Sequence, residues 1–300
     1  MTSTFIDADG PVHVADFGGP VGAPLLVLVH GLASSHAGWG SLAAQLTADH
    51  RVLAVDLPGH GRSPAAGRST AVLDSSDVLA RVVEQLDEPV TLVGHSMGAA
   101  ASLLAAASLP DRVERMILLA PPMPQRAVTI SAAVLPHVAM CLWPWAGRQA
   151  LRRRLSRAGT VEHVMNGLRR TCGSLEQAAR LAPALAAELE LALEAGEDPS
   201  ATFIEAARSV GLLVTHGETY RDAIAGAGCP VLVLHGELDR VLPAGAAATA
   251  EALRPDWDTR VLTDVGHSPH MEEPAYVAGL MSRFLTATDA DLSVDHALVC

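Results

Sequence analysis

An α/β fold with an open, mostly parallel central sheet is predicted by two features of this 300-residue sequence. Short apolar runs recur in the first and last parts of the chain, and segments with a helical residue pattern separate them. Continuous apolar runs are typical of parallel strands that are buried on both faces, and their alternation with helices favours such a sheet. Hydrophobic residues make up 49% of the chain, so a large core is available to cover the sheet.

The expected strands and helices follow one another in order. Strands are expected at residues 25–29, 52–55, 90–93, 116–119, 231–234 and 259–262, with residues 11–18 as an antiparallel edge strand. Helices are expected at residues 40–48, 73–86, 99–109, 244–253 and 274–285. The sheet is therefore flanked by helices along most of its length.

The alternation is interrupted from residue 122 to about residue 219. This stretch contains helix-like segments, and its only strand-like pattern is the run VGLLVTHG at residues 210–217. It has ten Arg and nine Asp or Glu, whereas the whole chain has a net charge of −12. A near-neutral helical insertion in an acidic α/β body predicts a cap. The expected division is a core of residues 1–121 and 220–288, a helical cap of residues 122–219, and a C-terminal tail of residues 289–300.

Composition argues against two classes of partner. An acidic chain repels phosphate backbones, so nucleic-acid binding is not expected. The most apolar stretch, residues 127–143, is interrupted by Pro136 and His137 and is shorter than the about 20 residues that a spanning helix needs, so stable membrane insertion is not expected. Four cysteines without a C-x-x-C pair, and an N-terminus without an apolar signal region, favour a cytoplasmic protein.

A sharp turn follows the expected strand at residues 90–93, in the sequence VTLVGHSMG. In a G-x-S-x-G turn between a strand and a helix, the serine lies at the bend with its hydroxyl pushed outward. Gly94 and Gly98 allow the neighbouring backbone to approach, and the N-terminus of the following helix points toward Ser96. The pattern alone also fits an ordinary strand-to-helix loop. Its context makes Ser96 the candidate nucleophile.

The turn and four further segments resemble the α/β-hydrolase superfamily. These segments are VLVHGLASS at 27–35, VDLPGHGRS at 55–63, PVLVLHGELDRVLP at 230–243 and DVGHSPHMEEP at 264–274. The resemblance covers most of residues 25–121 and 228–286, and it implies an α/β-hydrolase fold with the helical cap inserted after the sixth strand. The cap itself is not matched.

The resemblance implies a catalytic triad in the order Ser96, Asp239, His267. Asp239 matches the position of the triad acid, whereas Glu237 comes too early in the pattern. His267 matches the base through the glycine before it and the Glu-x-Pro that follows, which leaves His270 as a bystander. A neutral hydroxyl is a poor nucleophile, so the histidine has to take its proton and the aspartate has to orient the imidazole.

The resemblance also implies an oxyanion hole made by the backbone N–H groups of Leu32 and Met97. Such donors stabilise the negative charge that develops on a carbonyl oxygen. His30 is interpreted as a structural histidine, since the backbone and not its imidazole is needed. The loop at residues 55–63 is interpreted as scaffold, although His60 and Arg62 could line the pocket.

The predicted function is hydrolysis of a carboxylic ester or lactone of a hydrophobic small molecule through an acyl-enzyme, with no metal and no cofactor. No H-E-x-x-H motif or cysteine cluster supports a metal site. A thioester or C–C bond hydrolase, or a lyase, could use the same triad, and a non-catalytic ligand-binding role is the alternative of another class. Met140 and Trp143 in the apolar part of the cap are candidate pocket residues, although each could equally pack against other cap helices.

Overall fold

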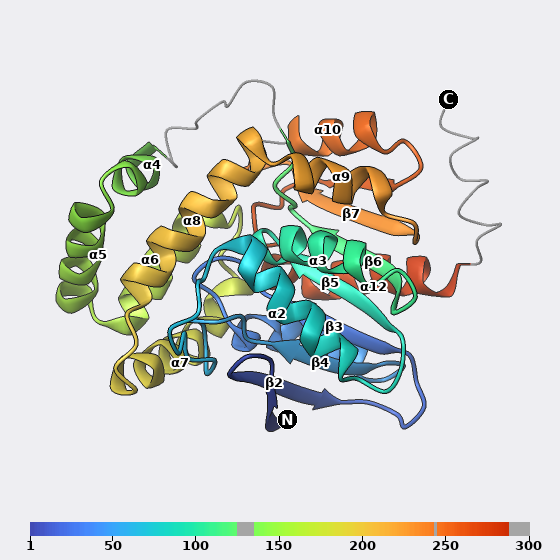
Figure 1. The fold of residues 1–300 in the computed structure, drawn as a ribbon, viewed down its shortest axis with the longest axis horizontal. Coiled ribbons are helices and arrows are strands. Elements are labelled where there is room, and N and C mark those ends of the chain that lie inside the picture. Colours follow the sequence, from blue (N-terminus) through green and yellow to red (C-terminus); the bar gives the residue numbers. More distant parts are fainter. Residues whose placement is uncertain (125–134, 243–244, 288–300) are drawn as a thin grey trace.

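The structure is a computed structural model, which describes residues 1–124, 135–242 and 245–287. An eight-stranded sheet forms its centre, in the order β1-β2-β4-β3-β5-β6-β7-β8 (Figure 1). The strands are β1 Thr2–Asp7, β2 Pro11–Gly18, β3 Leu25–Val29, β4 Arg51–Val55, β5 Val90–His95, β6 Val113–Leu119, β7 Val231–Gly236 and β8 Asp258–Leu262. Strand β2 pairs antiparallel with β1 and β4, and all other neighbours pair parallel. The α/β-hydrolase fold and the mostly parallel sheet expected from the sequence are thereby confirmed.

The central strands are buried on both faces, which explains their continuous apolar sequences. In β3, Val27 and Val29 belong to one hydrophobic cluster, while Leu26 and Leu28 belong to the other. Successive side chains of a strand point to opposite faces, so a strand between two helical layers needs apolar residues at every position.

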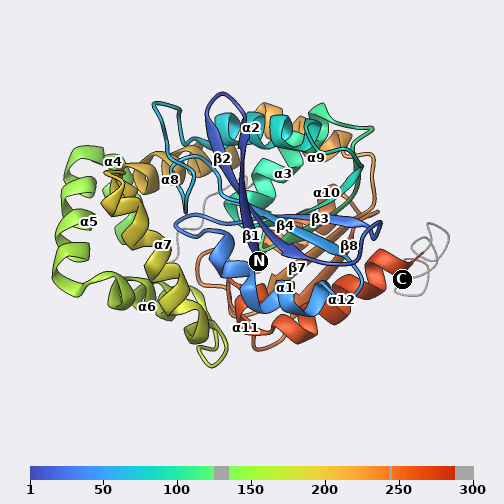
Figure 2. The same ribbon diagram turned by 90° about the horizontal axis from the view of Figure 1, so that it is seen from below.

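Helices cover both faces of the sheet, as Figure 2 shows. The helices of one layer are α2 Val72–Glu84, α3 Met97–Ser108, α9 Glu218–Gly226 and α10 Gly245–Leu253. The opposite layer contains α1 Gly40–Leu46 and α12 Pro274–Thr286, and the short helices η1 His36–Trp39 and α11 Pro269–Glu272 lie near it. Helices α1, α2, α3, α10 and α12 begin and end within a few residues of the expected bounds, whereas α9, η1 and α11 were not expected.

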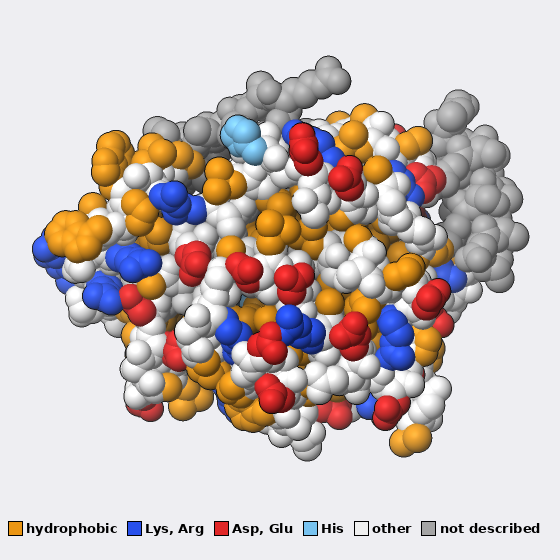
Figure 3. Space-filling view, viewed as in Figure 1, with side chains coloured by type: hydrophobic (Ala, Val, Ile, Leu, Met, Phe, Trp, Pro, Cys, Tyr) orange, Lys and Arg blue, Asp and Glu red, His pale blue; other side chains and the backbone are white. Residues whose placement is uncertain are grey.

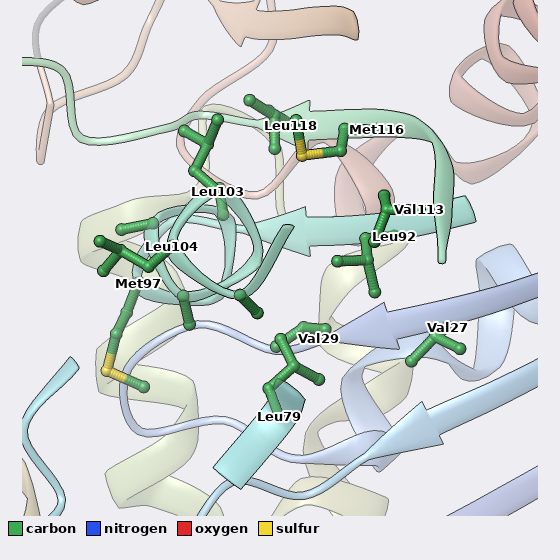
Figure 4. Close-up of a cluster of buried hydrophobic side chains, with 14 of the residues drawn as sticks. Val27, Val29, Leu79, Leu92, Met97, Leu103, Leu104, Val113, Met116 and Leu118 are labelled. Atoms are coloured by element: carbon green, nitrogen blue, oxygen red, sulfur yellow. The ribbon is translucent and has the colours of Figure 1, made fainter. Parts of the chain in front are cut away.

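Helix α3 is the most buried helix of the core. Its Met97, Leu103 and Leu104 belong to the same cluster as Val29 of β3 and Leu79 of α2 (Figure 4). Nine consecutive residues at its start are buried, so small alanines let it lie close to the sheet. This packing holds the serine turn before α3 in place.

The cap lies between β6 and β7 and is helical throughout its described part. Its helices are α4 Leu135–Leu142, α5 Pro144–Ala158, α6 Thr160–Thr171, η2 Ala178–Leu181, α7 Ala182–Glu194 and α8 Pro199–His216. The strand-like run at residues 210–217 is not a strand, because residues 210–216 complete α8 and Gly217 caps it. Ala206 and Leu213 are buried in the same hydrophobic cluster, and their spacing of seven residues places them on one helical face.

Two further comparisons concern the ends of the chain. Strand β1 was not expected, and its residues are largely exposed, so it lacks the apolar pattern that reveals a buried strand. The predicted tail at residues 289–300 lies outside the described residues.

Among the helices of the described part, none is long and apolar enough to cross a membrane.

Candidate active site

The serine turn has a backbone conformation that few residues adopt. Ser96 has φ +51° and ψ −117°, between the end of β5 and the first residue of α3. A Cβ at Gly98 would lie 2.2 Å from the carbonyl oxygen of Val29, and a Cβ at Gly94 would lie 2.5 Å from the Cα of Ala99. Glycine is therefore required on both sides of the serine, and the strained turn is held by its surroundings.

Three side chains named from the sequence come together at the carboxyl ends of the strands. The Nε2 atom of His267 lies 3.0 Å from the Oγ of Ser96, and its Nδ1 atom lies 2.7 Å from the Oδ2 of Asp239. Because a carboxylate only accepts, Nδ1 carries the proton and Nε2 offers its lone pair to the serine hydroxyl. The arrangement is a relay through which the serine proton can pass to the imidazole.

Asp239 is held as a buried anion. Its Oδ1 accepts the N–H groups of Val241 (2.8 Å) and Leu242 (2.9 Å). Burial alone would raise the pKa of Asp239, but the neighbouring His267 and His235 and the N–H of Leu242 outweigh burial and lower that pKa. Asp239 therefore stays ionised beside the imidazole. Glu237, the competing acid in the sequence, is exposed.

His95, the residue before the serine, fixes the backbone of His267. Its Nε2–H donates to the carbonyl oxygen of His267 at 2.8 Å. Burial, followed by the nearby charge of His267, lowers the pKa of His95 to about 3, so its ring is neutral. The His95 ring also contacts the ring of His270, which in turn contacts Trp39. His270 is thus part of the packing behind the site and not one of its reactive groups.

Glu272 joins the loop of His267 to the cap. Its buried carboxylate accepts N–H groups from Gly266 (2.9 Å) and Ser268 (3.1 Å), on either side of His267. It also accepts those of Gly173 (2.7 Å) and Ser174 (3.0 Å), which follow α6. Sequence reasoning used Glu272 only as a motif position and did not reveal this role, because the partners lie about a hundred residues away in the chain.

Leu32 and Met97 border the same cavity as Ser96. Met97 is the first residue of α3, so its N–H has no partner within the helix. His30, beside Leu32 in sequence, is buried, with Nδ1 bonded to the carbonyl of Gly31 (2.8 Å) and Nε2 accepting the N–H of Leu57 (3.0 Å). His30 is therefore structural, as expected.

A second cluster of ionisable groups has the composition of a metal site. His13, His36 and Asp56 are the one group in the described ranges whose ligand atoms lie close enough together to hold an ion. However, Oδ2 of Asp56 already accepts the Nδ1–H groups of His13 (2.8 Å) and His36 (2.9 Å) and the N–H of Arg62 (3.0 Å), and Oδ1 accepts the N–H of His36. Burial opposes the charge on Asp56, yet these histidines outweigh it and lower the pKa of Asp56. The donors fit a hydrogen-bonded junction between loops better than a metal site.

A cavity of about 820 Å³ lies between the core and the cap, and Ser96 and His267 line it. Most of the surface of this cavity is apolar, and many of its lining residues are leucine, valine and alanine. From α4, the lining residues are Val138, Cys141 and Leu142. Met140 and Trp143, the expected pocket residues, are not among the described residues that line it, and Trp143 is 66% exposed. Helical periodicity explains the difference, since Val138, Cys141 and Leu142 share one face of α4.

The fold and this arrangement of serine, histidine and aspartate define a class of protein, the α/β hydrolases. Residues 26–280 match the sequence model of the Alpha/beta hydrolase family, and the chain belongs to this family.

Several known proteins are similar to this chain. It is 38% identical over 110 residues to lipase LipV of Mycobacterium tuberculosis, a match that covers 37% of this chain and only 41% of the lipase. It is 28% identical to a pimeloyl-[acyl-carrier protein] methyl ester esterase of Nitrosomonas europaea, over 88% of this chain and 95% of the esterase. A thermophilic esterase from Thermogutta terrifontis superposes with a TM-score of 0.66 at 22% identity, covering 95% of this chain and 98% of the other.

Proposed function

We propose that this protein is a serine hydrolase that cleaves a carboxylic ester or lactone of a hydrophobic small molecule through an acyl-enzyme. The observation that carries the proposal is the relay from Ser96 through His267 to Asp239, with contacts of 3.0 and 2.7 Å, at the wall of a largely apolar cavity. Relatives named as lipase and esterase support ester bonds as the target.

The proposed chemistry proceeds in two halves. In the first, Oγ of Ser96 attacks the carbonyl carbon while Nε2 of His267 takes its proton, and the alcohol leaves with that proton. In the second, His267 takes a proton from water, and the water oxygen attacks the acyl carbon. The bond between that carbon and Oγ of Ser96 then breaks, Oγ regains a proton from His267, and the carboxylic acid leaves. Asp239 stabilises the charged imidazole in both halves.

The proposed oxyanion hole consists of the backbone N–H groups of Leu32 and Met97. The position of both residues at the cavity wall supports this assignment, as does the place of Met97 at the N-terminus of α3. A single donor of this kind contributes about 3–4 kcal/mol to stabilisation of the transition state. Two donors from the backbone need no reorganisation during the reaction.

We also propose that the cap, residues 122–219, acts as a separate domain on the core of residues 1–121 and 220–288. Its described helices enclose one side of the cavity, which supports a role in substrate selection. A mostly apolar lining favours a hydrophobic substrate over a sugar. The same relay also serves thioester and C–C bond hydrolysis, so substrate tests have to separate these reactions.

The test is hydrolysis of p-nitrophenyl esters of graded acyl length by the wild type and by Ser96→Ala. Turnover that depends on Ser96 is the expected result, and the preferred acyl length measures the usable depth of the cavity. Matching thioesters, assayed in parallel, separate the alternative. If the folded wild type cleaved none of these compounds, the esterase proposal would be wrong, and C–C bond hydrolysis, a lyase reaction or a ligand-binding role would remain.

A further inference from the structure

Among the charged side chains that line the cavity, positive ones outnumber negative ones. Among the described residues that line it, Glu188 is the one carboxylate. Both of its oxygens are occupied by Arg62, whose Nε and Nη2 donate at 2.9 and 2.8 Å. This pair joins α7 of the cap to the loop after β4, and it leaves the cavity wall without a free negative charge.

Three arginines line the same cavity, namely Arg154 of α5, Arg170 of α6 and Arg208 of α8. Arg208 donates to the carbonyl oxygen of Cys141 at 2.8 Å, a neutral partner. Within the part of the chain that the structure describes, no carboxylate lies at ion-pair distance from any of the three. Acidic residues outnumber basic ones by 33 to 21 in this chain, so an uncompensated positive charge at a substrate cavity is not explained by composition.

His163 of α6 lines the same cavity as Arg154 and Arg170. Burial, and then the charges of Arg154 and Arg170, lower the pKa of His163, so its imidazole is neutral. Its Nδ1 atom is buried and has no hydrogen-bond partner among the described residues. Two cationic side chains whose charges act on His163, and the unpaired Nδ1 atom of that histidine, thus belong to the lining of one cavity. Figure 3 shows basic side chains, all of them arginines in this chain, on the outer surface at the α5 end of the cap.

We propose that Arg154, Arg170 and His163 form an anion subsite, and that the natural substrate carries a carboxylate or phosphate in addition to the ester that is cleaved. The proposal rests on the proposed esterase function and adds a substrate class to it. Guanidinium groups bind carboxylate and phosphate in a planar, bidentate geometry. The apolar remainder of the wall would hold the hydrocarbon part of the same molecule.

The subsite should appear as a preference in kcat/KM. Arg154 and Arg170 are exposed to solvent, so screening limits the gain to about 10-fold for an anionic substrate over a neutral one. The preference should weaken as salt is added, because exposed charges are screened.

The experiment compares substrates that differ only in charge. Mono-p-nitrophenyl esters of dicarboxylic acids are paired with the same esters in which the free carboxylate is replaced by a carboxamide. A second series places the charge on the alcohol side, with butyrate esters of a hydroxyalkanoic acid and of its amide. The enzymes are the wild type, Arg154→Gln, Arg170→Gln and two controls, Arg153→Gln and Arg169→Gln. Each control changes the residue next to a subsite arginine, and neither Arg153 nor Arg169 lines the cavity.

The expected result is a carboxylate preference of about 10-fold in one of the two series. Arg154→Gln and Arg170→Gln should each bring the ratio toward one, while both controls keep the ratio of the wild type. Ser96-dependent cleavage without any charge preference, or a preference that survives in Arg154→Gln and Arg170→Gln, would overturn the subsite and leave the esterase function standing. Absence of Ser96-dependent cleavage of every neutral and charged ester would overturn both.

Discussion

The carboxylate of Glu272 accepts the backbone N–H of Gly173 at 2.7 Å, which ties the loop of His267 to the cap. A second bond joins the same two segments with the donor on the other side, since the N–H of His267 donates to the carbonyl oxygen of Thr171 at 2.8 Å. A Cβ at Gly266 would lie 2.3 Å from the nitrogen of Gly173, so the two segments are in close backbone contact. The position of the base and the position of the cap are therefore set by the same interactions.

Replacement of Glu272 should harm both stability and catalysis. Glu272→Ala leaves four N–H groups, two of them buried and two part-buried, without their acceptor, and we expect the free energy of unfolding to fall by about 3 kcal/mol. We also expect kcat to fall more than KM changes, because His267 loses its fixed position. Urea unfolding and steady-state kinetics measure the two effects. Glu273→Ala, at the adjacent exposed position, is the matched control, and an equal loss in both variants would refute this role.

The assignment of the acid predicts a contrast between two neighbouring carboxylates. Asp239→Asn removes the charge beside Nδ1 of His267 and favours the wrong tautomer, so kcat should fall by about 10⁴-fold. Glu237→Gln, at an exposed position, should change kcat less than about threefold. The two variants are compared in one ester assay after circular dichroism has shown that both fold. A larger loss in Glu237→Gln would mean that the acid is misassigned.

The glycine after the serine turn predicts a steric effect. In Gly98→Ala the new Cβ would meet the carbonyl oxygens of Val29 and His30 at 2.2 and 2.4 Å, so β3 or α3 has to shift. We expect a loss of about 3 kcal/mol in the free energy of unfolding, together with loss of activity. Gly279→Ala in α12 meets no atom within 4 Å and should stabilise the protein by up to about 1 kcal/mol. Thermal unfolding measures the stability of both variants. Equal stability of Gly98→Ala and Gly279→Ala would mean that the serine turn is loosely packed.

Buried neutral histidines predict a loss of stability in mild acid. Burial is the main cause that lowers the pKa of His60 and His95 to about 3, from an ordinary value of 6.5. Between these values the unfolded chain binds protons that the folded chain does not, so stability falls as pH falls below 6.5. Each histidine contributes about 1.4 kcal/mol per pH unit to this slope.

Urea unfolding between about pH 7 and pH 4.5 measures that slope. His60→Gln should reduce it by about one proton, whereas His216→Gln, at an exposed position, should leave it unchanged. A free energy of unfolding that is flat over this interval would contradict the neutral, buried state of these rings.

Local patterns predicted the elements that are buried on both faces but not those that depend on distant partners. The run at residues 25–29 is apolar at every position, and the strand occupies the same residues. Strand β1 escaped prediction because its order comes from pairing with β2 and not from burial. Residues 210–217 have a strand-like pattern although most of them belong to α8, since a short apolar run does not reveal its period until the whole helix is considered.

In the candidate site, too, local sequence patterns predicted some residues, whereas others depend on contacts between distant parts of the chain. Ser96 stands in a motif whose strand-to-helix geometry is local, and its neighbours His267 and Asp239 follow from the resemblance and lie within hydrogen-bond distance of one another. The bonds of His95 and Glu272 join residues far apart in the chain, so no local pattern indicates them. The cavity wall on α4 depends on which helical face turns inward, and composition alone pointed to Met140 and Trp143 instead.

The most direct test of the central claim is covalent labelling of the native protein with a fluorophosphonate, followed by peptide mass spectrometry. The proposed relay predicts one adduct, on Ser96, that is lost in His267→Ala. Ser34 and Ser268 line the same cavity and serve as internal controls, since neither is bonded to the imidazole of His267 among the described contacts. Labelling of Ser96 alone is the result that the account predicts. An unlabelled Ser96, or equal labelling of the three serines, would contradict the claim that Ser96 is an activated nucleophile.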